Sequence, residues 1–199
     1  IRRIAELPRR CLMDTPLSPA CSAGRPEHPE RQAKEPRIIL ISGERNSGKT
    51  TRLWREIARY RTMPEVRLGG VATLPVPPGV VSKSEYVLQD IQTGESRLLM
   101  SEHEIPGGER FGRFFVDTSV FSWGNSVILA QFAHSTHIVF DEIGRIELSG
   151  GGLAPSFSVA VRQGHIVVIA VVRTSFLSDV VRTFALDMDD CSVISCVRA

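Results

Sequence analysis

At residues 38–53 the chain reads Ile38-Ile39-Leu40-Ile41-Ser42-Gly43-Glu44-Arg45-Asn46-Ser47-Gly48-Lys49-Thr50-Thr51-Arg52-Leu53. The loop from Gly43 to Thr50 matches the pattern G-x-x-x-x-G-K-[ST] at every fixed position. The apolar run before it is typical of a buried parallel strand. Residues 49–61 after it repeat apolar side chains near helical spacing. Strand, loop and helix in this order indicate a phosphate-binding loop, or P-loop.

The chemistry of phosphate binding explains the fixed positions of this loop. Gly43 and Gly48 allow backbone angles that turn N–H groups inward around an anion. The helix that follows adds its free N–H groups and its dipole. We expect Lys49 to reach the β- and γ-phosphates and the Thr50 hydroxyl to bind Mg²⁺. The residues expected to surround the nucleotide phosphates are Gly43, Glu44, Arg45, Asn46, Ser47, Gly48, Lys49, Thr50 and Thr51.

Length and composition limit the classes of protein to which the chain can belong. Its 199 residues and 42% apolar content suit one domain with a hydrophobic core. A net charge of +2 is too small to indicate nucleic-acid binding. No apolar run is long enough to cross a membrane, and the N-terminus has no signal-peptide pattern, so we expect a cytoplasmic protein. The chain begins with Ile, which leaves open that it is a piece of a longer protein.

Two segments of different character follow from proline and charge content. Residues 1–36 contain many Arg, Pro, Ser and Glu residues without periodicity, and we expect a poorly ordered, basic, proline-rich extension there. Its arginine pairs leave open a contact with an acidic partner. Residues 37–199 contain the P-loop and are expected to form the folded nucleotide-binding domain.

The rest of the chain reads as a β-rich insertion followed by an alternation of helices and apolar strands. In the insertion we expect strands at 66–73, 84–90, 97–100 and 114–117, and a mobile loop at 101–112. After it we expect helices at 120–133, 154–163 and 176–184, the last capped by Ser175, and strands at 137–142, 165–172 and 191–197. The pattern predicts an α/β, three-layer P-loop NTPase fold with a mostly parallel central sheet and a small β-rich insertion.

An acid pair, Asp141-Glu142, ends the strand expected at 137–142. In P-loop folds an Asp at the end of a neighbouring strand holds Mg²⁺ together with the loop hydroxyl, so we expect Asp141 and Thr50 to be the metal ligands. Glu142 would then orient a water for attack on the γ-phosphate and take its proton. The alternative is that the two acids only end a strand and cap a turn; the P-loop favours the catalytic interpretation.

Three further charged residues are candidates for the site. Arg173 ends the next apolar strand, where its planar fork could stabilise charge on a transferred phosphoryl group. An exposed arginine at a strand end is an equally good interpretation. Arg145 and Glu147 follow the acid pair closely and could position the water or couple the site to a neighbour.

These motifs together resemble the THEP-type nucleoside-triphosphatases, broad-specificity P-loop hydrolases of bacteria and archaea. The resemblance covers residues 37–197, and its most specific part is Asp141-Glu142-Ile143-Gly144-Arg145-Ile146-Glu147-Leu148. It implies Mg²⁺-dependent hydrolysis of nucleoside triphosphates to diphosphate and phosphate. It also implies the additional-strand class of P-loop folds, with the strand of Asp141 between the P-loop strand and others. Residues 74–79 lack the charged residues that many members carry after the corresponding strand.

The leading functional hypothesis is therefore an NTP hydrolase that uses ATP, GTP and other nucleotides. A nucleotide-dependent regulatory or adaptor module, acting on a protein partner through the loop at 101–112 or the basic extension, is the alternative. A small-molecule kinase is less favoured because the acid pair suits water as the acceptor and no arginine-rich lid is visible. No Asn-Lys-x-Asp guanine-reading motif is present, so strict use of GTP is not expected.

Overall fold

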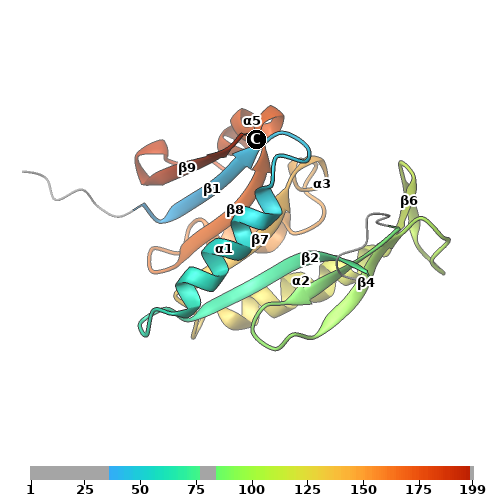
Figure 1. The fold of residues 1–199 in the computed structure, drawn as a ribbon, viewed down its shortest axis with the longest axis horizontal. Coiled ribbons are helices and arrows are strands. Elements are labelled where there is room, and N and C mark those ends of the chain that lie inside the picture. The colour runs from blue at the N-terminus through green and yellow to red at the C-terminus, as the bar shows by residue number, and fades with distance from the viewer. Residues whose placement is uncertain (1–35, 77–83, 198–199) are drawn as a thin grey trace, which may run out of the picture. The chain divides into compact units, whose positions relative to one another are not determined.

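A computed structural model describes residues 36–76 and 84–197 of the chain. The extension expected at residues 1–36 lies outside these residues, apart from Pro36, and stays a prediction. In the described part, one nine-stranded sheet has the strand order β5-β6-β4-β3-β2-β7-β8-β1-β9 (Figure 1). Among the described residues, no helix has the length and apolar character needed to cross a bilayer.

Five neighbouring strands of this sheet are parallel. They are β2 (Leu68–Val76), β7 (His137–Ile143), β8 (Val167–Arg173), β1 (Ile38–Gly43) and β9 (Cys191–Cys196). The central strands are rich in Val and Ile, as parallel strands covered on both faces require. Because all five point the same way, their carboxyl ends meet at one edge of the sheet. The P-loop and the acid pair both lie at that edge.

The remaining strands form the expected β-rich insertion and pair antiparallel. They are β3 (Glu85–Asp90), β4 (Ser96–Ser101), β5 (Glu109–Phe111) and β6 (Phe114–Val116). The prediction of a loop at residues 101–112 is partly wrong, since β5 lies within this range. All three residues of β5 are exposed and show no apolar alternation, so they gave no strand signal. Pairing with the edge of β6 is what orders them.

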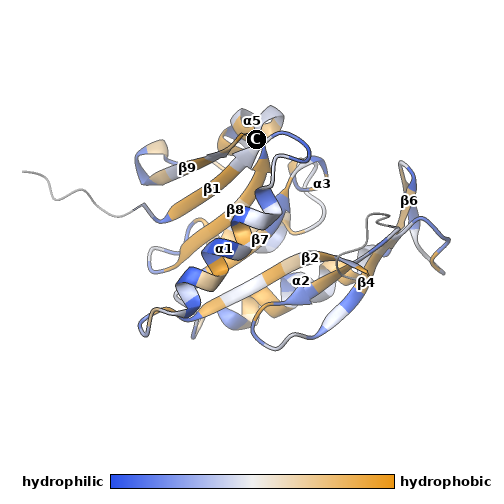
Figure 2. Ribbon diagram, in the orientation of Figure 1, coloured by the Kyte–Doolittle hydropathy of each residue, from blue (hydrophilic) through white to orange (hydrophobic). Residues whose placement is uncertain are grey.

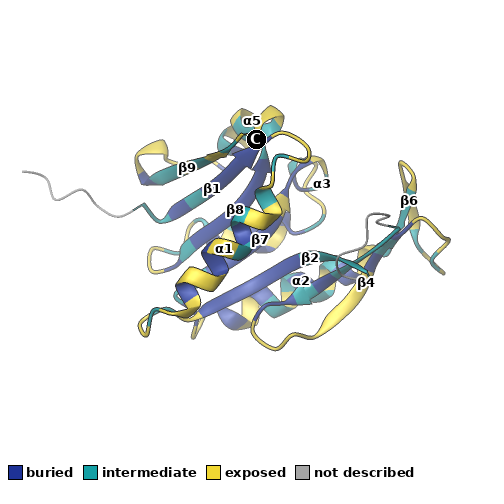
Figure 3. Cartoon of the chain, in the orientation of Figure 1, coloured by how far each residue is buried: buried dark blue, intermediate teal, exposed yellow. Residues whose placement is uncertain are grey.

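Helices cover the parallel strands on both faces, which confirms the three-layer arrangement. One face carries α1 (Lys49–Arg61), whose Leu53 and Ile57 pack against the strands. The other face carries α2 (Thr118–Gln131), α4 (Ala154–Ala160) and α5 (Leu177–Thr183). The strands are apolar in Figure 2 and buried in Figure 3, while the outer surface of α1 is polar and exposed.

The ends of the helices differ in whether a local sequence signal marks them. The Asp117 side chain accepts a hydrogen bond of 2.9 Å from the Ser119 N–H, so it caps α2. The cap expected from Ser175 is wrong: it lies within a short 3₁₀ turn, Thr174–Phe176, and makes no side-chain cap to α5. A second short turn, Met188–Asp190, precedes β9, and the single helical turn α3 (Arg145–Leu148) follows β7. Neither of these two had a periodic signal.

Strand order places one additional strand between the P-loop strand and the strand of the acid pair. The strand of Asp141, β7, pairs with β8 and β2, and β8 in turn pairs with the P-loop strand β1. The strand next to the P-loop is therefore β8, which ends in Arg173, rather than the strand of the acid pair. This order brings Arg173 into direct register with Gly43.

Candidate functional site

The P-loop closes tightly around its first glycine. A Cβ atom at Gly43 would lie 2.3 Å from Ser47 Oγ and 2.7 Å from the carbonyl oxygen of Cys196, so no larger residue fits there. Gly48 has φ +85°, in the left-handed region that favours glycine. The two fixed glycines of the motif are therefore required by this backbone. Within the described residues, the buried Ser47 hydroxyl has no hydrogen-bond partner, which suits a loop built around a polar ligand.

Lys49 begins α1 at the end of this loop. Its Nζ donates a hydrogen bond of 2.7 Å to the Glu44 carbonyl oxygen of the same loop. Burial lowers the pKa of Lys49, while the negative charge of Glu142 opposes that change. Thr50 is exposed at the first turn of α1. The lysine and the acid pair therefore interact electrostatically across the edge of the sheet.

The acid pair lies in a bulge at the end of β7. Phe140 pairs with Ala170 and Ile143 pairs with Val172, so β7 has one more residue than β8 over this span. The extra residue keeps Phe140 and Ile143 in the same core cluster, although they are three residues apart. Asp141 is buried, whereas Glu142 is exposed and has φ +60°. The bulge thus gives the two adjacent carboxylates different environments.

Asp141 is held by the backbone of β2. Its Oδ2 accepts a hydrogen bond of 3.0 Å from the Thr73 N–H. Burial raises the pKa of Asp141 from 3.8 to about 7. The Thr73 hydrogen bond and the positive charge of Lys49 oppose this rise, whereas the negative charge of Glu142 adds to it. A carboxylate in this position is costly without a cation beside it. Its oxygen chemistry and that of the Thr50 hydroxyl suit Mg²⁺, which prefers oxygen ligands.

Glu142 and Arg173 form an ion pair at the ends of the adjacent strands β7 and β8. Arg173 Nε donates to Glu142 Oε1 at 2.5 Å, and each side chain is between two-fifths and half exposed. Since Arg173 is in register with Gly43, this pair lies beside the start of the P-loop. The structure therefore brings together Lys49, Asp141, Glu142 and Arg173. The other loop candidates Glu44, Arg45, Asn46 and Thr51 are exposed around them.

The strained backbone of Glu142 predicts an unusual order of stability between two variants. Glu142→Gly is expected to have a free energy of unfolding about 1 kcal/mol greater than Glu142→Ala, because only glycine adopts φ +60° without a steric cost. Both variants lose the Arg173 ion pair, so its contribution cancels. Urea denaturation of the two proteins measures the difference.

Glu65 provides the matched control for this comparison. It is exposed and does not have a positive φ. There, the alanine variant should be more stable than the glycine variant, as at ordinary positions. If Glu142→Ala proved as stable as Glu142→Gly, the backbone at Glu142 would not be strained.

Glu147 has a structural role that the sequence did not show. Its buried carboxylate accepts hydrogen bonds from the Gly144 N–H at 2.9 Å and the Leu153 N–H at 3.3 Å. Burial raises the pKa of Glu147, and these backbone hydrogen bonds oppose the change. Glu147 therefore fixes the turn that follows the acid pair, and a role in positioning the water stays a prediction. Arg145 is exposed, and within the described part of the chain it forms no ion pair with the site.

Two other contacts were missed because they depend on tertiary register. The backbone N–H of Thr73 reaches Asp141 only because β2 is the neighbour of β7. The carbonyl oxygen and Cβ of Cys196 pack closely beside Gly43, because β9 pairs in register with β1. An apolar strand pattern predicts that such strands exist but not which of them are neighbours.

A P-loop entering α1, a strand that ends in an acid pair, and an additional strand between them define a P-loop NTPase of the additional-strand class. A family model described as NTPase matches residues 38–195, so the chain belongs to this family of nucleoside triphosphatases. It is therefore an enzyme of the nucleoside-triphosphatase type, and its THEP-type resemblance is confirmed.

Two solved structures have a similar fold. One is the crystal structure of THEP1 from the hyperthermophile Aquifex aeolicus, with a TM-score of 0.62 and 17% identity over 80% of this chain and 90% of that one. The other is the solution structure of a human cancer-related nucleoside triphosphatase, with a TM-score of 0.59 and 17% identity over 79% of this chain and 87% of that one. At this identity they support the fold. A sequence search of curated proteins found no match.

Proposed function

We propose that the chain hydrolyses nucleoside triphosphates to diphosphate and phosphate in a Mg²⁺-dependent reaction at the carboxyl edge of the sheet. One observation carries this proposal. The register of β1 with β8 puts Arg173 beside Gly43, and the 2.5 Å ion pair puts Glu142 beside Arg173. A phosphate-binding loop, a cationic fork and an exposed carboxylate thus adjoin one another at a single edge.

The binding roles follow from the donor set. The loop amides and Lys49 would hold the β- and γ-phosphates once Lys49 exchanges the Glu44 carbonyl for a phosphate oxygen. Thr50 and Asp141 would hold Mg²⁺, directly or through water. The cation supplies neutralisation of charge on the phosphate oxygens. Its charge would also favour the ionised form of Asp141, which burial disfavours.

Hydrolysis needs a water, a base and an in-line approach to the γ-phosphorus. The Glu142 carboxylate would orient the water and accept its proton as the oxygen attacks. The bond from the γ-phosphorus to the oxygen bridging it to the β-phosphate breaks, and the electron pair leaves with the diphosphate. Before this step Arg173 must exchange Glu142 for a γ-phosphate oxygen, which frees the carboxylate and brings a planar donor to the developing charge.

The proposed substrates are ATP, GTP and other nucleoside triphosphates, because the chain has no guanine-reading Asn-Lys-x-Asp motif. We propose a cytoplasmic location, because the sequence has no apolar run long enough to cross a membrane and no signal-peptide pattern. A slowly turning-over regulatory module is the second candidate. The Glu142–Arg173 ion pair favours it, since a carboxylate engaged by an arginine is a poor acceptor for a proton from water.

The experiment that tests hydrolysis measures phosphate release from ATP, GTP, CTP and UTP, with Mg²⁺ and with EDTA. We expect multiple turnovers with each nucleotide and Mg²⁺, and a loss of at least a hundredfold in EDTA, because metal charge stabilisation is worth several kcal/mol. Tight nucleotide binding without turnover would favour the regulatory module instead. An equal rate in EDTA would exclude the proposed metal role.

A further inference from the structure

A cleft of about 480 Å³ opens beside α3, on the side of the insertion. Its walls come from β5, the first half of α2, α3 and the glycine-rich turn before α4. Of the described residues that line it, none belongs to the P-loop. The volume is within the range of about 300–1,000 Å³ that is typical of small-molecule sites. The cleft can therefore hold one small molecule separately from the triphosphate site.

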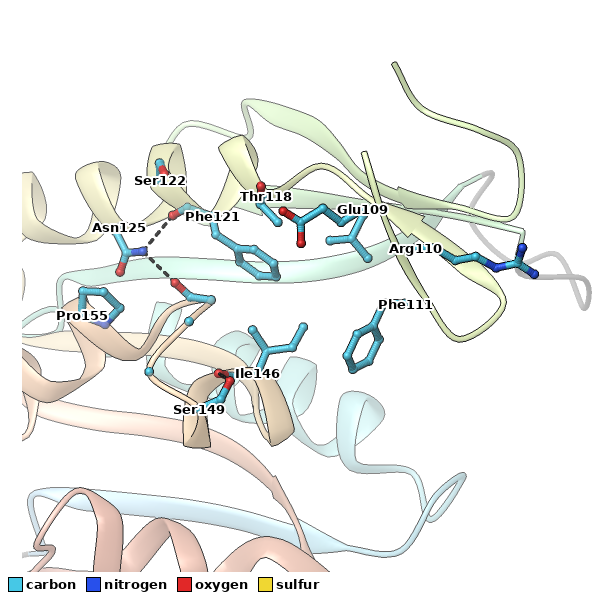
Figure 4. A pocket seen from close by; sticks show the side chains of 14 residues that line it. Glu109, Arg110, Phe111, Thr118, Phe121, Ser122, Asn125, Ile146, Ser149 and Pro155 are labelled. Carbon is cyan, nitrogen blue, oxygen red and sulfur yellow. Dashed lines mark hydrogen bonds between the residues drawn. The ribbon is translucent and has the colours of Figure 1, made fainter. Parts of the chain in front are cut away.

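The walls of the cleft are apolar and partly aromatic. Phe111 of β5, Phe121 of α2 and Ile146 of α3 extend toward the same space (Figure 4). Phe111 is 49% exposed, which leaves its ring open to a ligand. Two phenylalanine rings beside a cavity are suited to a flat ring system, since stacking does not require a particular substituent.

The polar groups of the cleft exclude some ligand classes. Glu109 points toward the cavity (Figure 4), and Thr118 and Ser122 of α2 are among the residues that line it. The guanidinium of Arg110 extends away from the cavity, and its Cζ lies 5.9 Å from the centre of the Phe115 ring. A carboxylate accepts hydrogen bonds and repels anions, so the cleft disfavours phosphates and carboxylates. It favours a neutral ligand with N–H or O–H donors.

The cleft is held open by hydrogen bonds among its own walls. The Asn125 amide donates to the carbonyl oxygens of Phe121 and Gly152, each at 2.9 Å (Figure 4). Its Oδ1 accepts from the Ser156 N–H at 2.9 Å. One side chain thus connects α2, the glycine-rich turn and α4. A ligand would enter a preformed site and would not have to order these segments.

One wall of the cleft is connected to the acid pair. Ile146 lies on the turn that Glu147 fixes through its hydrogen bonds to the Gly144 and Leu153 N–H groups. This turn begins two residues after Glu142. A Cβ at Gly144 would lie 3.9 Å from Glu142 Cγ, so this turn packs beside the Glu142 side chain. A ligand against Ile146 would therefore contact the turn that packs beside the Glu142 side chain.

From these observations we infer that the cleft is a second binding site for a neutral nucleoside or nucleobase, and that its occupancy alters turnover at Glu142. The aromatic side chains stack on the planar base, and the Glu109 carboxylate accepts hydrogen bonds from its amino groups or from the ribose hydroxyls. The effect on turnover rests on the proposed hydrolytic function, whereas the binding does not.

Binding is tested with adenosine, guanosine, cytidine and uridine, which have no phosphate for the P-loop. Saturation-transfer NMR and calorimetry on the full chain should show saturable binding of at least one of them. Phe111→Ala should weaken it about tenfold through lost stacking, and Ser122→Trp, which fills the cleft, should abolish it. Lys49→Ala and Leu129→Ala, the latter on an exposed part of α2, should leave it unchanged.

Three outcomes would overturn the second site: no saturable binding of any nucleoside, unchanged binding in a folded Phe111→Ala protein, or loss of binding in Lys49→Ala. Coupling is tested by phosphate release at a saturating nucleoside concentration. We expect at least a twofold change in wild type, and Phe111→Ala should need about tenfold more nucleoside for the same change. An unchanged wild-type rate would overturn the coupling alone. Absence of phosphate release without nucleoside would count against the hydrolytic function and not against the binding site.

Discussion

Glu142→Gln is expected to bind nucleotide at least as tightly as wild type and to lose about 10²–10⁴-fold in turnover. The amide has nearly the shape of the carboxylate but cannot accept the proton of the attacking water. Nucleotide affinity is retained because the phosphates are held by the P-loop and Lys49, which the substitution does not touch. Fluorescent-nucleotide titration measures the affinity, and multiple-turnover phosphate release measures the rate.

Glu65→Gln is the matched control, because it makes the same change at an exposed position in the turn after α1. It should have wild-type turnover. The substitution also weakens the ion pair with Arg173, and the freed arginine can bind the γ-phosphate more tightly. A modest increase in affinity together with the lost rate therefore agrees with the proposal. Wild-type turnover in Glu142→Gln would falsify the assignment of the base.

Local chemistry explains which parts of the site could be predicted. The P-loop needs glycines, a lysine and a hydroxyl at fixed spacing, and the glycine requirement is visible in the steric contacts of Gly43. The acid pair was recognisable because it ends an apolar strand. Both signals lie within a few residues of the sequence. They were sufficient for the fold class and for Lys49, Asp141 and Glu142 at the sheet edge.

The remaining features depend on pairing between distant strands. The interpretation of Arg173 was evenly balanced from the sequence, and it was the register of β8 with Gly43 that brought it to the P-loop. The bulge at Glu142 is visible only when β7 is aligned with β8. From the sequence, Glu147 resembled a second functional acid. Its two backbone partners, in a turn and at the start of α4, can be identified only in the folded chain. The cleft beside α3 is formed by segments that are not adjacent in the sequence.

Asp141→Asn is expected to stabilise the metal- and nucleotide-free protein at pH 8 while lowering turnover by about a hundredfold or more. In the folded protein, burial raises the pKa of Asp141 to about 7 from 3.8. The stability that this protonated acid contributes is fully present below about pH 4 and is lost as the pH rises through 7. An amide is neutral at every pH and can still accept the Thr73 hydrogen bond. The loss of activity follows because the amide is a weaker ligand for Mg²⁺.

Urea denaturation in EDTA between pH 5 and pH 8 measures this difference. The gap in free energy of unfolding between Asp141→Asn and wild type should widen in favour of the variant as the pH rises, by a few kcal/mol at most. Asp117→Asn controls for the change from carboxylate to amide, because asparagine also caps a helix and no such widening is expected. Added Mg²⁺ and nucleotide should narrow the gap, since the cation stabilises the ionised Asp141 of wild type alone. Parallel pH profiles for wild type and Asp141→Asn would mean that Asp141 is already ionised in the empty site. In that case the buried carboxylate would need no cation, and the argument for Mg²⁺ at this position would lose its electrostatic basis.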